Sequence, residues 1–326
     1  MTIELQHLRG LTAKLKENLA KCENTPDVDV VHDTRTGTRR VQATVEALLR
    51  ELPESTGEDA VRAAGEAWLR LLKKIRRTAG PVRDLDVHRK LLEKLVKRGR
   101  DFAAAGEIAG GLAEKSGESI AEASKPDIVN APALTLPQNP AEKRAEDLDG
   151  WLKHERQHLA TDLQKNATKW VSKLDTRLQA LEAALSEHKG RRRRTRKAAE
   201  VALDSFALLV SEIQQLDSIT LHDFRKGAKK ARYLTETAVE EVDAKLVGGA
   251  LKKLQDEIGD WHDWLLLAEE AHRALGKRGK ELIAMIEAER DRHYVLSMKI
   301  AGKLRGRLMG EWQATKSRVR HRTSIR

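Results

Sequence analysis

The stretch His32-Asp33-Thr34-Arg35-Thr36-Gly37-Thr38-Arg39-Arg40 returns later in the chain as His222-Asp223-Phe224-Arg225-Lys226-Gly227-Ala228-Lys229-Lys230. Both copies fit the pattern H-D-x-R-x-G-x-[RK]-[RK] in register. A second element follows each copy in the same order: Lys73-Lys74-Ile75, Gly80 and Arg83-Asp84 after the first, and Lys252-Lys253-Leu254, Gly259 and His262-Asp263 after the second. Because two matched elements recur in one order, the sequence predicts a duplicated unit.

Apolar residues around these motifs recur at helical spacing. The first series is Leu5, Leu8, Leu11, Leu15 and Leu19, three or four residues apart, as one face of an amphipathic helix requires. Two further series have the same spacing: Val41, Val45, Leu48, Leu49 and Leu52 before Pro53, and Leu174, Leu178, Leu181 and Leu185. The 326 residues are 34% charged and only 3% aromatic, a composition that favours helices over sheets. We therefore predict an all-α protein.

The repeats and one proline-rich segment suggest how the chain is divided. Four of the seven prolines lie close together among Ser, Gly and Asn residues, namely Pro126, Pro132, Pro137 and Pro140. This composition is typical of a loop or linker. We predict one domain over 1–326, made of a first half-repeat 3–115, a linker or insertion 116–140, a second half-repeat 141–310 and a basic tail 311–326.

Each H-D motif predicts a helix with a basic face opposite its apolar face. On a helical wheel the first basic face carries His32, Arg35, Arg39 and Arg40. The second carries His222, Arg225, Lys229 and Arg232. An ordinary solvated surface is the alternative, but such a surface needs no fixed register of His and paired basic residues.

A row of cations without matching carboxylates is unfavourable unless an anion lies among them. Arg offers a planar fork to phosphate oxygens and Lys a point charge. Two such faces brought together would form a basic groove or cavity for a long polyanion without sequence, and phosphate polymers fit that description. The net charge of +11 agrees with an anionic partner.

Catalytic chemistry is harder to find, since the sequence contains no glycine-rich phosphate loop, nucleophile elbow or H-E-x-x-H motif. The two His-Asp dipeptides leave a metal-dependent phosphohydrolase as a weaker alternative, since the surrounding Arg and Lys would repel a cation. We expect Asp33 and Asp223 in the first turns of their helices, where the helix dipole favours acids. Asp84 and Asp86 either orient basic side chains through ion pairs or have a structural role at a helix start.

Other features allow a second hypothesis and a location. Arg191 to Arg194, Arg196 and Lys197, together with the basic tail, would suit a nucleic-acid-binding protein; solvated, frayed segments are the simpler interpretation.

The Trp residues are interpreted as core or interface residues. The single cysteine, Cys22, excludes an intramolecular disulfide. The start lacks the apolar core of a secretory signal and no segment is apolar enough to span a membrane, so we expect a cytoplasmic protein without membrane insertion.

The repeated H-x-x-R-x-x-x-[RK]-[RK] pattern, the stretch Gly80 to Val87 and the stretch Ala228 to Tyr233 resemble the CHAD family, the conserved histidine α-helical domain. The resemblance spans roughly residues 3 to 310. It implies a helical bundle of two pseudo-symmetric, duplicated halves of four-helix type, with long helices around a basic central groove or pore. It also implies binding of inorganic polyphosphate at polyphosphate granules, with no catalysis and no cofactor. Other polyanions and granule-associated proteins would be further partners.

The resemblance assigns binding candidates position by position. In the first half these are His32, Arg35, Arg39, Arg40, Lys73, Lys74, Arg77 and Arg83. In the second half they are His222, Arg225, Lys229, Lys230, Arg232, Lys252 and Lys253. Gln42 stands where the second copy has Arg232, and Asp256 stands where the first has Arg77, so the halves need not contribute equally.

Overall fold

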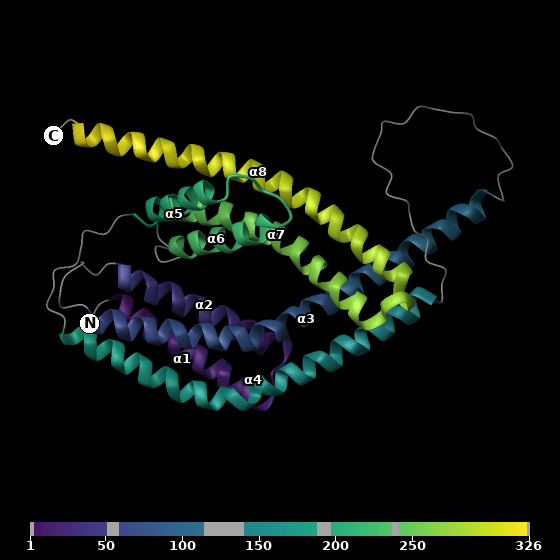
Figure 1. Ribbon diagram of the computed structural model, residues 1–326, viewed down its shortest axis with the longest axis horizontal. Helices are drawn as coiled ribbons and strands as arrows, with labels where there is room; N and C mark the ends of the chain where they lie inside the picture. The colour runs from purple at the N-terminus through teal and green to yellow at the C-terminus, as the bar shows by residue number, and fades with distance from the viewer. Residues whose placement is uncertain (1–2, 51–58, 114–139, 188–196, 237–240, 325–326) are drawn as a thin grey trace.

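The computed structural model describes residues 3–50, 59–113, 140–187, 197–236 and 241–324, and every element in these ranges is helical (Figure 1). The elements are α1 (Ile3–Asn24), α2 (Val28–Arg50), α3 (Asp59–Ala113), α4 (Pro140–Glu187), α5 (Ala198–Glu212), α6 (Thr220–Thr235), α7 (Val242–Leu275), the 3₁₀ helix η1 (Gly276–Gly279) and α8 (Lys280–Ser324). The all-α prediction is confirmed. No helix in these ranges has the length and apolarity that crossing a membrane requires.

Helices α1 to α4 form one bundle around a common core. The leucine series of α1 faces inward, so that Leu8, Leu15 and Leu19 are fully buried. They pack with Trp68 of α3 and Trp170 of α4, two of the largest fully buried side chains. Helix formation here follows from burial of an apolar stripe on each helix.

Helices α5 to α8 form a second bundle with its own core. Phe206 of α5 and Phe224 of α6 meet edge to face, with ring centroids 5.8 Å apart. Leu254 and Trp261 of α7 and Leu304 of α8 belong to the same cluster. In Figure 1 this bundle is green to yellow and lies beside the purple-to-teal first bundle.

The first bundle extends further along the chain than the first half-repeat predicted at 3–115. Helix α4 lies within the predicted second half-repeat, 141–310, yet Leu163, Trp170 and Leu174 pack into the core of α1 to α3. The first bundle therefore includes residues up to Glu187, and the second begins at Ala198. The reason is that α4 carries an apolar stripe that closes this core. The predicted linker lies outside the described residues apart from Pro140, with which α4 begins.

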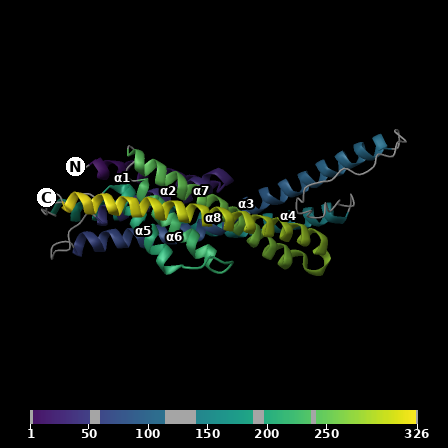
Figure 2. The same cartoon turned by 90° about the horizontal axis from the view of Figure 1, so that it is seen from above.

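A third cluster joins the two bundles at one end. Leu92 of α3 and Leu152 of α4 pack there with Leu267 of α7 and Ile283 of α8. A buried polar contact between His88 Nδ1 of α3 and Glu270 Oε2 of α7, 2.7 Å apart, lies between the same helices. The bundles are thus held together by α3, α4, α7 and α8, which Figure 2 shows from above.

The predicted basic tail is not a separate frayed segment over its described part. Helix α8 continues to Ser324. Trp312 Nε1 donates a hydrogen bond to Asp204 of α5 at 2.8 Å, and Lys316 Nζ lies 2.8 Å from the same carboxylate. Trp68, Trp170, Trp261 and Trp264 are buried, as predicted for core residues.

Candidate functional site

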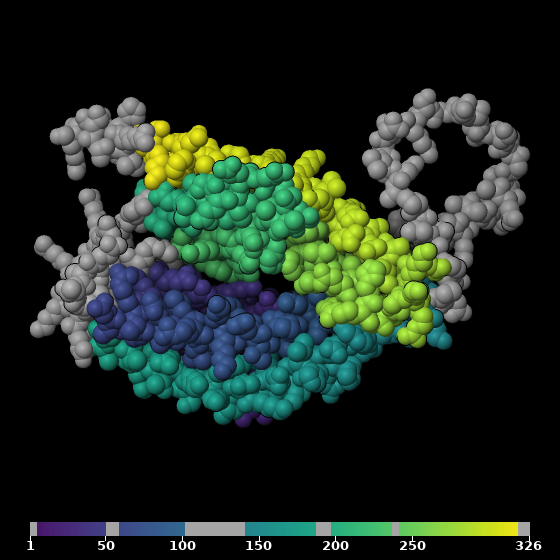
Figure 3. Space-filling model, in the orientation of Figure 1, coloured from purple at the N-terminus to yellow at the C-terminus, as the bar shows by residue number. Residues whose placement is uncertain are grey.

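The two H-D motifs lie on α2 and α6, which face each other across the two bundles. Val41 and Val45 anchor α2 in the first core, while Phe224 and Ala231 anchor α6 in the second. Because each motif places its cations opposite these apolar residues, the basic faces turn toward the space between the bundles. The two helices contact each other. Figure 3 shows the surface hollowed between the purple-to-blue segment of α2 and α3 and the green segment of α6 and α7.

Cations from both motif helices gather in this space. Burial, followed by the charges of Arg39 and Arg225, lowers the pKa of Lys229 to about 6. Burial also lowers the pKa of Arg39, whose cationic neighbours are Arg35, Arg225 and Arg76. Within the described ranges no carboxylate lies within ion-pair distance of Arg39, Arg76 or Lys229. Arg39, Arg76 and Lys229, with Arg35 and Arg225 beside them, form what we call the central cluster. Positive charge is concentrated unfavourably there, and a bound anion would relieve this.

The first arginine of each motif is held by the neighbouring long helix. Arg35 Nη1 donates to the Gly80 carbonyl at 2.9 Å and to Asp84 Oδ1 at 2.6 Å. Arg225 Nε donates to the Gln255 carbonyl at 3.3 Å. Of the two roles open for Asp84, the orientation of a basic side chain is the one observed.

Two further carboxylates, Asp263 and Asp86, have surroundings that differ from those of Asp84. Asp263 matches Asp84 in the second copy, and burial raises its pKa to about 6. Asp86 is fully buried and accepts a hydrogen bond from Arg156 of α4, which also donates to the Pro26 carbonyl. Asp86 therefore has a structural role between α3 and α4, in the interior of α3 and not at a helix start.

The motif histidines have unequal surroundings. His222 stacks on His262, with ring centroids 4.3 Å apart and planes at 29°. Burial, then the His222 charge, lower the pKa of His262 to about 4. His222 Nδ1 is buried and has no hydrogen-bond partner among the described residues. In the first motif His32 is exposed, and after burial the charge of Arg83 is the largest cause that lowers its pKa.

The motif aspartates were expected in first turns, which is correct for one of them. Asp223 lies in the first turn of α6 and pairs with Lys226 at 2.5 Å. Asp33 lies beyond the first turn of α2, where the acidic residue is Asp29. The expectation for Asp33 was wrong because α2 begins at Val28, before the motif.

The other predicted residues do not all join the central cluster. Arg232 is half-buried, pairs with Glu236 at 3.0 Å and lies over the ring of Tyr233, 4.9 Å from its centroid. Arg83 is half-buried, and its Nη1 has no hydrogen-bond partner in the part of the chain that the structure describes. Seven predicted residues are exposed on the helices that flank the space: Arg40, Lys73, Lys74, Arg77, Lys230, Lys252 and Lys253.

Two members of the cluster were missed by the sequence analysis. Arg76 of α3 is half-buried, and Tyr233 of α6 has a buried hydroxyl. Arg76 precedes Gly80 by four residues and Arg83 by seven, which places all three on one helix face. That spacing was the available signal, but the second copy has Gln255 in place of Arg76, so the repeat did not reveal it.

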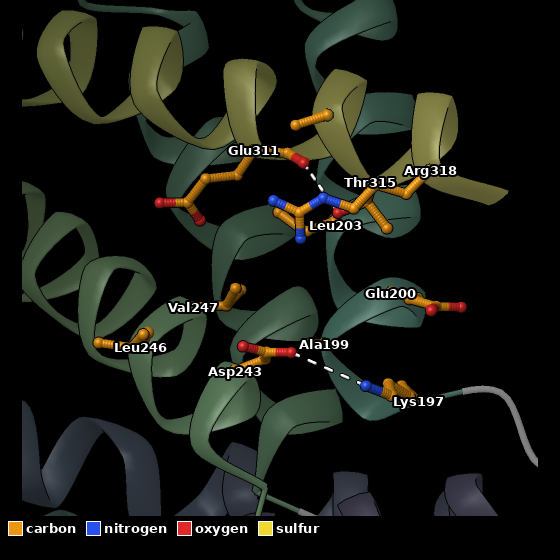
Figure 4. Close-up of a pocket in the computed structure, with 11 residues that line it drawn as sticks. Lys197, Ala199, Glu200, Leu203, Asp243, Leu246, Val247, Glu311, Thr315 and Arg318 are labelled. Carbon is orange, nitrogen blue, oxygen red and sulfur yellow. Dashed lines mark hydrogen bonds and ion pairs between the residues drawn. The ribbon is translucent and has the colours of Figure 1, made fainter. Parts of the chain in front are cut away.

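The segments of the nucleic-acid hypothesis lie elsewhere. Residues 191–196 are outside the described ranges. Lys197 lies 3.9 Å from Asp243 at a pocket of about 280 Å³ between α5, α7 and α8 (Figure 4). The pocket is lined by both acids, such as Glu311, and cations, such as Arg318, unlike the central cluster. In the described ranges no three His, Cys, Asp or Glu side chains gather as metal ligands would.

Comparison with known proteins gives one match. The family model described as CHAD domain matches residues 6–272, which include both motifs and nearly all of α1 to α7. No curated protein and no solved structure matches the chain.

Proposed function

This chain belongs to the CHAD domain family, and on that premise we propose that it binds inorganic polyphosphate without hydrolysing it, in a basic groove between its two bundles. The observation that carries the proposal is the cluster of Arg39, Arg76 and Lys229. Three helices bring these cations together, with no carboxylate at ion-pair distance in the described ranges. A polyanion supplies the missing negative charge.

The polymer proposed is one of phosphate alone. Single-stranded nucleic acids are held by aromatic side chains on which bases stack, as well as by cations. Trp68, Trp170, Trp261 and Trp264 are buried in cores and present no such platform. Arginine forks and lysine ammonium groups suit repeated phosphate oxygens.

The duplicated motifs give the proposed groove two walls. Arg35 and Arg39 line it from the first half, and Arg225 and Lys229 line it from the second, on equivalent helices. One polymer would therefore contact both bundles at once. In the cell we propose that the protein lies in the cytoplasm and associates with polyphosphate granules, with granule proteins as further partners.

Direct titration with long-chain polyphosphate tests the proposal. It is run at about 150 mM salt, where exposed charges more than about 8 Å apart are largely screened. Single- and double-stranded DNA are added as competitors at equal charge. Tight binding that DNA does not displace is the expected result. Equal displacement by DNA would mean a generic basic surface, and release of phosphate with or without divalent metal would contradict the non-catalytic part.

A pair of matched glycines gives the first mutational prediction. A Cβ added at Gly259 would lie 2.7 Å from Arg225 Nη2, whereas one added at Gly80 would meet nothing within 4 Å. Gly259→Ala should displace the Arg225 guanidinium and weaken polyphosphate binding about fivefold, since one hydrogen bond is worth about 1 kcal/mol. Gly80→Ala should leave the affinity unchanged.

Both alanines lie inside helices, where alanine is favoured over glycine by about 0.5–1 kcal/mol. Melting temperatures should therefore stay level or rise in both variants, which separates a binding effect from unfolding. Equal affinities of Gly259→Ala and Gly80→Ala would show that the position of Arg225 does not matter.

A further inference from the structure

Side chains from three helices converge on the hydroxyl of Tyr233. Tyr233 lies on α6 in the second bundle, whereas Arg39 and Arg76 lie on α2 and α3 in the first. Tyr233 is an electrostatic neighbour of both guanidinium groups, and both in turn act on its hydroxyl. Because α2 and α6 contact each other, the phenol oxygen lies among charged groups of both bundles.

The Tyr233 hydroxyl and two neighbouring guanidinium nitrogens can donate hydrogen bonds but have no acceptor among the described residues. Tyr233 Oη, Arg76 Nη1 and Arg232 Nε are all buried, and none has a hydrogen-bond partner in the described structure. A buried polar group left unsatisfied costs about 1–3 kcal/mol. The charges of Arg76 and Arg232 both act on the Tyr233 hydroxyl, so the three groups are neighbours, and one ligand that only accepts hydrogen bonds would satisfy them together. A phosphate group, with several anionic oxygens, is such a ligand.

The ring of Tyr233 is suited to donate. Burial raises the pKa of its hydroxyl, so the phenol keeps its proton at neutral pH. The Arg232 guanidinium lies 4.9 Å above the ring and is itself held by Glu236. The ring therefore has a defined position, in which Arg39 and Arg76 of the first bundle are electrostatic neighbours of its hydroxyl.

We propose that Tyr233, Arg39 and Arg76 form a single phosphate subsite, in which the Tyr233 hydroxyl donates a hydrogen bond to a phosphate oxygen that the two arginines also bind. This inference rests on the proposed function and adds a neutral donor to a site otherwise described by its cations. It also fixes one phosphate of the polymer at the junction of the bundles.

Tyr233→Phe tests the subsite because it removes only the hydroxyl. A hydrogen bond to a charged group contributes about 1.5–3 kcal/mol, so affinity for long-chain polyphosphate should fall at least about tenfold. The melting temperature of the free protein should stay level or rise, because an unsatisfied hydroxyl is removed. Tyr294→Phe is the matched control, since Tyr294 of α8 packs against Trp261 away from the cluster. Its affinity should equal that of the wild type.

A double-mutant cycle with Arg76→Gln separates a shared phosphate from a structural role. If one phosphate contacts both side chains, the loss in the double variant should be clearly smaller than the product of the single losses. Unchanged affinity in Tyr233→Phe, or multiplicative losses in the cycle, would overturn the subsite while wild-type binding leaves the proposed function standing. If the wild type binds no polyphosphate, the proposed function itself fails.

Discussion

The double variant Arg39→Ala/Lys229→Ala should lose polyphosphate affinity by about a hundredfold or more. Each substitution removes a charged donor from one wall of the proposed groove, and a hydrogen bond to a charged group is worth about 1.5–3 kcal/mol. Each single variant should lose about tenfold. The dissociation constants are measured by titration with long-chain polyphosphate, and the helical content by circular dichroism.

The same double variant should not be less stable than the wild type. Arg39 lies among like charges without a carboxylate partner in the described ranges, and Lys229 is buried with its pKa lowered to about 6, so removing them relieves repulsion and desolvation. Loss of function together with level or higher stability is typical of residues kept for binding. Lys226→Ala is the control, because Lys226 is exposed on the same helix and pairs with Asp223. Full affinity in the double variant would exclude the cluster as the site.

Polyphosphate binding should strengthen as pH falls from about 8 to about 6, by up to tenfold per pH unit for one linked proton. The pKa of Lys229 is about 6 in the free protein because of burial and of the neighbouring Arg39, Arg225, Arg35 and Arg232. A bound polyanion favours the charged amine and raises that pKa. Between the free and bound values binding takes up a proton, so acid favours the complex, and the effect levels off below about pH 6.

The stability of the free protein should change with pH in the direction opposite to the affinity for polyphosphate. The pKa of Lys229 is lower in the folded chain than its ordinary value of 10.5, so the unfolded chain binds more protons between about pH 6 and 10.5. The free energy of unfolding should therefore rise with pH across this window.

Calorimetry near pH 8, in buffers of different ionisation enthalpy, measures the proton uptake directly. About one proton should be taken up per bound site in the wild type. In Lys229→Arg the uptake should be close to zero, because arginine stays protonated in proteins, with a pKa above about 12. The same uptake in both proteins would show that Lys229 is not the linked group.

The sequence predicted the helices well because their signal is local. The leucine spacing of α1 and the apolar stripe around Val41 depend only on neighbouring residues, and both helices are found with these faces buried. The bundle boundary could not be predicted in the same way. Helix α4 belongs to the first bundle because Trp170 and Leu174 fill a core built by three distant helices, and no local pattern encodes that choice.

The residues of the candidate site could likewise be predicted only where a pattern in the sequence marked them. The repeat pointed to Arg35, Arg39, Arg225 and Lys229 because both copies share these positions. Arg76 was missed because the second copy has Gln255 at the matching position, so the repeat did not distinguish Arg76 from the exposed Arg77 beside it. The unequal surroundings of the two motif histidines likewise arise from the partner helix.

The converging cations have a consequence for the lifetime of the protein. A polymer held by Arg39 of one bundle and Lys229 of the other acts as a cross-link between them, in addition to the apolar cluster at their far end. By mass action a ligand at a hundred times its dissociation constant adds about 2.7 kcal/mol to stability. For the proposed complex, we expect resistance to proteolysis to follow the amount of polymer available.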